Sequence, residues 1–345
     1  MPRAAIAVLA AALSLSLASP AAAETDGVKR IGQETANPRT PGTLRLASYN
    51  ALNLFDAHDD PMLQGRNDDA DDTKPDAEKK ALAEAIRAID ADVIGMQEIE
   101  SFSALQEFVD EYLSEMGYKH IVSIDVGQER GIENAVISRF PLSGARVWPG
   151  YPLGGVHPEK YGDSRNWYAG EPITFRRSPL MVDVTVPAET TGTGEPYEFT
   201  LFVVHHKSGY HNGYWREAEA ETIVSFINDF QRDDRTRNIA VLGDFNAQAH
   251  EKSVGLYRER AGMTHALGHE GRDRKELLTH SSGRAIDFVL LNRAMAGELV
   301  EGSPFVFATP VRPEDADWRT TPAPEGYASD HMPVVVDLRL QDTPD

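Results

Sequence analysis

The pattern of apolar and polar positions along the chain predicts a mixture of strands and helices. Near the N-terminal third, Leu44 and Leu46 alternate with Arg45, Ala47 and Tyr49, which is typical of a strand. Short apolar or alternating runs predict further strands at residues 92–97, 134–138, 180–186, 197–205, 238–242, 285–291 and 333–340. A Gly-rich stretch between the strands at 180–186 and 197–205 favours a hairpin connection.

Apolar residues three or four positions apart predict helices at residues 76–91, 103–116 and 215–230. In the first of these, Leu82, Ala85, Ile86 and Ile89 form one stripe. Residues 143–177 follow neither period, and we expect them to be irregular. Strands and helices joined by short connections indicate one α/β domain with two packed sheets.

The first 23 residues have the pattern of a secretory signal peptide. Arg3 is followed by an apolar run from Ile6 to Leu17 and by three alanines that end at Ala23. The alternative is an uncleaved N-terminal anchor. We therefore divide the chain into a signal peptide at 1–23, a flexible lead-in at 24–42 and a catalytic domain at 43–341, and expect a secreted or periplasmic protein cleaved near Ala23.

Composition narrows the classes of function. The 345 residues are 41% hydrophobic, enough for a sizeable core, and no later apolar run is long enough to cross a membrane. The absence of cysteine excludes a zinc site built on thiolates. The net charge of −20 opposes binding to nucleic acid or anionic lipid unless a local basic patch or a bound metal ion neutralises the substrate.

Residues 56–75 form an acidic segment with two readings. The simpler one is a solvated loop. The other is a calcium site, because hard cations prefer clustered carboxylates, although no EF-hand spacing is present.

Polar clusters lie at the ends of six predicted buried strands. A strand holds its end residues rigidly, and each buried polar group costs free energy unless it is paired. The clusters are Tyr49-Asn50, Gln97-Glu98, His205-His206-Lys207-Ser208, Gly243-Asp244-Phe245-Asn246, Ile286-Asp287 and Ser329-Asp330-His331. Any one has an ordinary explanation, but six in one chain indicate a site.

In order and type, these clusters resemble the motifs of the endonuclease/exonuclease/phosphatase superfamily. The resemblance covers roughly residues 44 to 340 and is specific for the superfamily, but it says little about the substrate. It implies a four-layer α/β/β/α sandwich with two packed mixed sheets and the site at one open edge of the sheets.

The resemblance also implies roles for individual residues. Glu98 matches the main metal-binding carboxylate, Asn50 supports metal and phosphate, and Asp330 is a further metal or outer-shell ligand. Carboxylate and amide oxygens suit Mg²⁺, with Mn²⁺ or Ca²⁺ as alternatives.

The catalytic roles implied by the resemblance fall on five residues. Asp244 orients or deprotonates water, Asn246 contacts the scissile phosphate, and His205 contacts phosphate or aids the leaving group. His331 transfers a proton or contacts the phosphoryl group, and Asp287 orients it, which agrees with the proton chemistry of histidine near neutral pH.

Two further features remain open at this stage. His205 and His206 are adjacent on a strand and point to opposite faces, and we favour His205 as the one that faces the site. Arg165, Arg176 and Arg177 occur near aromatic residues, where they either bind phosphate beside stacked bases or are ordinary loop and surface residues.

We therefore expect a monomeric, secreted, metal-dependent phosphoester hydrolase, and favour an endonuclease acting on nucleic acid. The alternatives are a phosphodiesterase or phosphatase acting on phospholipid head groups or small phosphomonoesters, and a non-enzymatic binding protein on the same fold.

Overall fold

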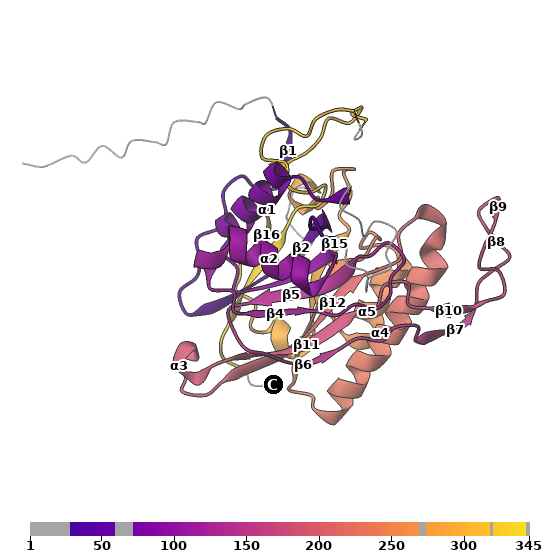
Figure 1. The fold of residues 1–345 in the computed structure, drawn as a ribbon. Helices are drawn as coiled ribbons and strands as arrows, with labels where there is room; N and C mark the ends of the chain where they lie inside the picture. Colours follow the sequence, from indigo (N-terminus) through magenta and orange to yellow (C-terminus); the bar gives the residue numbers. More distant parts are fainter. Residues whose placement is uncertain (1–27, 59–71, 269–273, 318–319, 343–345) are drawn as a thin grey trace, which may run out of the picture.

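The computed structural model describes residues 28–58, 72–268, 274–317 and 320–342. The predicted signal peptide and most of the acidic 56–75 segment lie outside these residues. Two six-stranded sheets form the centre of the molecule (Figure 1).

The first sheet, sheet 1, contains the strand predicted at Leu44. Its strands in spatial order are β16 (Phe305–Val306), β18 (Val334–Arg339), β2 (Thr43–Leu54), β3 (Val93–Ile99), β5 (Glu133–Ser138) and β4 (His120–Ser123). Only the β2–β3 pair is parallel, so the sheet is mixed.

Sheet 2 has a matching plan. Its strands in spatial order are β14 (Thr264–His265), β15 (Asp287–Leu291), β13 (Asn238–Asp244), β12 (Tyr197–His205), β11 (Leu180–Val186) and β6 (Leu142–Arg146). The β12–β13 pair is parallel, and the other pairs are antiparallel. The antiparallel β11–β12 pair is the predicted hairpin connection, with the short helix α3 (Ala188–Thr191) between its strands.

Helices cover the outer faces of the two sheets. The outer face of sheet 1 carries α1 (Asp76–Ile89) and α2 (Phe102–Tyr112), and that of sheet 2 carries α4 (Gly213–Asp233) and α5 (Lys252–Ala261) (Figure 1). The remaining helical turns are η2 (Ser114–Met116), η3 (Tyr210–Asn212), η4 (Arg274–Leu277) and α6 (Arg293–Ala296). The expected α/β/β/α sandwich is thus confirmed.

Three apolar layers hold the sandwich together. Alternate side chains of β2 point to opposite faces of sheet 1 and so contribute to two of these layers. Leu44 and Leu46 belong to the layer between the two sheets, whereas Ala47 and Tyr49 belong to the layer under α1 and α2. The sheets approach closely at Gly95, where an added Cβ would lie 2.3 Å from the Leu242 side chain. Burial of apolar area on both faces of each sheet stabilises the fold at about 25 cal/mol per Å².

Two segments differ from the sequence-based expectation. The lead-in was expected to be flexible, but Arg30–Ile31 forms β1, which pairs with β17 (Thr309–Pro310), and the Ile31 side chain is buried. A two-residue strand has no periodicity, so its remote partner could not be predicted.

The 143–177 segment was expected to be irregular, but it contains most of β6 and a projecting arm. The arm is built from β7 (Pro152–Val156) paired with β10 (Pro172–Thr174), and from the small hairpin of β8 (Lys160–Tyr161) and β9 (Ser164–Arg165). The small hairpin extends away from the body beyond α4 (Figure 1).

Candidate active site

The strand ends bring the predicted site residues to one edge of the sandwich. Within each sheet the central pair of strands is parallel, so Asn50 and Glu98 lie at one end of sheet 1, and His205 and Asp244 lie side by side in register in sheet 2. Asp287 opens β15, which runs antiparallel, and lies opposite Asp244. His331 precedes β18, which is antiparallel to β2, and so reaches the same edge.

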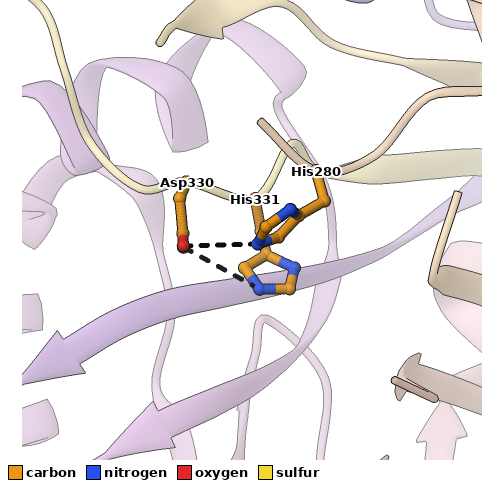
Figure 2. A group of neighbouring side chains, drawn as sticks. All are labelled: His280, Asp330 and His331. Carbon is orange, nitrogen blue, oxygen red and sulfur yellow. Dashed lines mark ion pairs between the residues drawn. The ribbon is translucent and has the colours of Figure 1, made fainter. Parts of the chain in front are cut away.

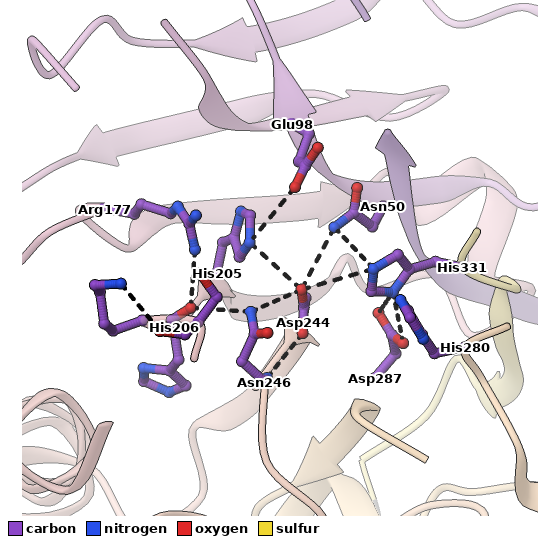
Figure 3. Close-up of polar contacts among 12 residues, drawn as sticks. Asn50, Glu98, Arg177, His205, His206, Asp244, Asn246, His280, Asp287 and His331 are labelled. Atoms are coloured by element: carbon purple, nitrogen blue, oxygen red, sulfur yellow. Dashed lines mark hydrogen bonds and ion pairs between the residues drawn. The ribbon is translucent and has the colours of Figure 1, made fainter. Parts of the chain in front are cut away.

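The Asp244 carboxylate lies at the centre of the group (Figure 3). Its Oδ2 is 3.4 Å from His205 Nε2, 3.5 Å from Asn50 Nδ2 and 3.9 Å from His331 Nε2. Glu98 joins the group through His205, whose Nε2 is 3.8 Å from Glu98 Oε1. Residues from both sheets thus converge on one carboxylate.

A tight turn after β13 fixes Asn246 against Asp244. The backbone N–H of Asn246 donates to Asp244 Oδ1 at 2.8 Å, and its side-chain amide donates to Asp244 Oδ2 at 2.9 Å. Asn246 and Glu98 adopt positive φ values of 48° and 60°. Asparagine tolerates this left-handed region, whereas a glutamate rarely adopts it, so the backbone at Glu98 is the more constrained of the two.

His331 and Asp287 form a buried pair. The Nδ1 atom of His331 lies 3.0 and 2.9 Å from the two Asp287 oxygens, and Thr279 Oγ1 donates to Asp287 Oδ2 at 2.7 Å. Burial alone would lower the pKa of His331, but the charges of Asp287, Asp244 and Asp330 raise this pKa well above its usual value. The pair therefore presents a cationic imidazole with Nε2 toward the centre of the site.

The other titratable groups of the site have different protonation tendencies. Burial raises the pKa of Asp244 to about 6, partly offset by the charge of His331. Burial, followed by the charge of Arg177, lowers the pKa of His205 well below its usual value. His205 is therefore neutral and donates from one ring nitrogen, whereas the cationic His331 beside it carries a proton on both ring nitrogens.

The adjacent His206 faces away from this group, as the strand period requires. Its Nδ1 lies 3.0 Å from Glu219 Oε2, and its Nε2 lies 3.0 Å from the Tyr257 hydroxyl. Glu219 and Tyr257 belong to α4 and α5. His206 is thus a packed histidine under the outer helices, and His205 is the one at the site.

Asp330 lies on the far side of His331 and has a partner that sequence reasoning missed (Figure 2). His280 Nε2 is 3.3 Å from Asp330 Oδ2, and Ser282 N–H donates to His280 Nδ1 at 3.0 Å, which leaves the imidazole proton on Nε2. Burial raises the pKa of Asp330, but the contact with His280 and the charge of His331 bring it down to about 2.

Three other residues at the site were not assigned to it from the sequence. Arg130 Nη2 lies 3.2 Å from Glu98 Oε2, Arg177 Nη1 donates to the His206 carbonyl at 3.0 Å, and Thr279 supports Asp287. The sequence indicates Arg177 only as part of a basic and aromatic stretch. No motif marks the other two, because long-range packing alone brings them to this edge.

The oxygen atoms at this edge fit a hard divalent cation. Asp330 Oδ1 is buried and has no hydrogen-bond partner, and Glu98 supplies a second carboxylate. The Asn50 side-chain oxygen accepts one hydrogen bond, from Leu52 N–H at 3.0 Å, and keeps a second lone pair. Oxygen ligands of this kind suit Mg²⁺, Mn²⁺ or Ca²⁺.

Comparison with known proteins agrees with this geometry. Residues 47–331 match the model of the Endonuclease/Exonuclease/phosphatase family. The chain belongs to this family. The recognition of the superfamily from six strand-end clusters is therefore confirmed. No curated protein matches the sequence closely enough to narrow the activity further.

Solved structures share the fold of this family member at low sequence identity. The catalytic domain of human Nocturnin is 15% identical over 92% of this chain and 98% of its own, with a TM-score of 0.54. A truncated TDP2 from Caenorhabditis elegans is 14% identical over 86% and 97%, with a TM-score of 0.54. A family protein from Bacteroides vulgatus is 15% identical over 87% and 99%, with a TM-score of 0.53. At this identity the likeness shows the fold.

Members of the family are hydrolases that act on phosphoester bonds and generally depend on divalent metal ions. Among the described residues, no helix combines the length and the apolar character that a membrane span requires.

Proposed function

We propose that the protein is an exported, Mg²⁺-dependent endonuclease that hydrolyses phosphodiester bonds of nucleic acid. The observation that carries this proposal is the arrangement around Asp244. One buried carboxylate lies within hydrogen-bonding or ionic reach of Asn246, Asn50 and His205, with the cationic His331 beside it. Phosphoester hydrolysis needs a base for water together with donors for the phosphoryl oxygens.

The roles follow from the protonation states of the side chains. In its ionised form Asp244 accepts a proton from the attacking water. Asn246, His205 and His331 donate to oxygens of the scissile phosphate, and Asp287 keeps His331 cationic while the leaving oxygen departs. Positioned general acids and bases typically contribute about 10²–10⁴-fold each.

A divalent ion would be held by Glu98, Asn50 and Asp330. When bound, it supplies charge neutralisation on the phosphate oxygens.

Nucleic acid is the favoured substrate because the cations near the site compensate for an acidic chain. The net charge is −20, yet Arg130 and Arg177 adjoin the catalytic group. Export is proposed on the N-terminal pattern, with cleavage near Ala23. Sequencing the N-terminus of the protein recovered from its native host tests export, and an active cytosolic enzyme that keeps Met1 would contradict it.

A substrate panel tests the activity. The purified chain with Mg²⁺ is given plasmid DNA, single-stranded RNA, sphingomyelin and a simple phosphomonoester. Asp244→Asn, prepared identically, is the control for contaminating nucleases. We expect internal cleavage of nucleic acid by the unmodified chain and not by the variant. Hydrolysis of sphingomyelin or the phosphomonoester alone would assign the site to the alternative substrates.

A further inference from the structure

A pocket of about 270 Å³ opens beside the catalytic group, between the projecting arm and the start of α4. Its lining includes Arg130, which contacts Glu98, and Arg177, which contacts the backbone of His206. The pocket therefore adjoins the catalytic edge. Trp167, near the small hairpin of the arm, and Trp215, on α4, contribute aromatic walls.

The lining is strongly cationic for so acidic a chain. Arg130, Arg176, Arg177 and Lys207 face a single carboxylate, Glu129, which pairs with Arg176. Burial, and to a smaller extent the charge of Arg177, lowers the pKa of Lys207 to about 8. Such an excess of positive charge is stabilised when an anion binds.

Arg177 is a buried cation in the wall of the pocket. The residue is only 8% exposed, and its Nε has no hydrogen-bond partner. Its positive charge, which is held in place by the hydrogen bond from Nη1 to the His206 carbonyl, favours an anion in the pocket.

The aromatic residues give the pocket a second kind of surface. Trp167 is 84% exposed, so the face of its ring is accessible for stacking. Arg176 lies over the Tyr168 ring at 5.7 Å, and Lys207 lies over Trp215 at 5.7 Å. Cations interleaved with exposed aromatic rings are the combination that binds the backbone and stacks the bases of single-stranded nucleic acid.

We propose that this pocket binds the nucleotide next to the scissile bond, with its phosphate at Arg176, Arg177 and Lys207 and its base stacked on Trp167. This proposal rests on the proposed nuclease function and specifies how the site selects an oligonucleotide. A lipid surface is the less favoured partner, because the cations are recessed in a pocket beside the catalytic group.

Binding is measured first without catalysis. Fluorescence anisotropy follows a labelled thymidine tetranucleotide added to the full chain in EDTA. Trp167→Ala should weaken binding, raising Kd by about 10-fold, because loss of one base–aromatic stack costs about 5–150-fold. Arg176→Ala removes a charged phosphate contact and should also raise Kd by about 10-fold. Trp167→Phe should restore much of the affinity. The matched controls are Tyr210→Ala and Arg165→Ala, which change an exposed aromatic and an exposed arginine outside the pocket lining.

Kinetics with Mg²⁺ separate this proposal from the proposed function. For each of Trp167→Ala and Arg176→Ala, KM is compared with that of the unmodified chain on two substrates. The increase in KM should be at least 10-fold larger for the tetranucleotide than for bis(p-nitrophenyl) phosphate, which has no neighbouring nucleotide. An unmodified chain that hydrolyses neither substrate would contradict the nuclease function itself. Active variants with unchanged Kd and KM would overturn only the pocket. The pocket proposal would also be wrong if the unmodified chain bound sphingomyelin vesicles through Trp167 and did not bind the tetranucleotide.

Discussion

The pairing of His331 with Asp287 makes the sharpest prediction about catalysis. His331→Ala removes the cationic donor and should lower kcat/KM by about 10²–10⁴-fold. Asp287→Asn keeps the shape of the side chain. Its carbonyl oxygen can take the place of Oδ2, which accepts from both Thr279 and His331. What the substitution removes is the negative charge that raises the pKa of His331.

The size of the Asp287→Asn effect follows from that lost charge. A hydrogen bond to a charged group contributes about 1.5–3 kcal/mol, which corresponds to about 10–150-fold in kcat/KM. Because the folded-state pKa of His331 falls in the variant, its cationic form is lost as pH rises. Activity of Asp287→Asn should therefore recover partly toward lower pH, within the range where Asp244 stays ionised.

The assay is a double-mutant cycle on kcat/KM, with circular dichroism and thermal unfolding as controls for folding. Residues that act as a unit lose their shared function once, so the double variant should be close to His331→Ala alone. Asp183→Asn is the matched control, because it removes an aspartate charge from sheet 2 outside the group around Asp244. If the two losses simply multiply, or if folded His331→Ala keeps near-normal activity, the pairing is wrong.

Three further predictions concern stability and pH. Arg45→Met leaves Asp337 unpaired at 1% exposure and should cost about 3–5 kcal/mol in the free energy of unfolding, measured with urea; a loss under about 1 kcal/mol would contradict the role of the pair. Gly243 has φ +139°, and Gly243→Ala would place a Cβ 1.9 Å from the Val204 carbonyl oxygen, so this variant should not fold normally. Gly255 lies in a helix, and Gly255→Ala should raise the free energy of unfolding by about 0.5–1 kcal/mol. Equal stability of the two variants would refute this prediction. Because burial raises the pKa of Asp244 to about 6 and the ionised form is the base, kcat/KM should rise with pH up to about 6 and then level; a flat profile from pH 4 to 8 would exclude that role.

The sequence predicts the parts of the fold that carry periodic apolar burial. The alternation through β2 and the stripe on α1 are local patterns, and both elements form where they were expected. The strand-end clusters also predict which residues meet, because parallel strands bring Asn50 near Glu98 and His205 beside Asp244.

The remainder depends on long-range pairing that leaves no local signal. The arm around β7 contains adjacent glycines and mostly exposed residues, so it shows no apolar period. His280 reaches Asp330 only because residues 280 and 331 form an antiparallel bridge. Neither the bridge nor the burial of Arg177 is marked by a motif, although both change the electrostatics of the site.

Removal and return of the metal ion tests the central claim most directly. The purified chain is treated with EDTA, exchanged into metal-free buffer and assayed on single-stranded DNA before and after addition of Mg²⁺, Mn²⁺ or Ca²⁺. Glu98→Gln is assayed in parallel. We predict that cleavage stops in chelator, returns with Mg²⁺ or Mn²⁺, and requires far more metal in the variant. Full activity in excess chelator would contradict it.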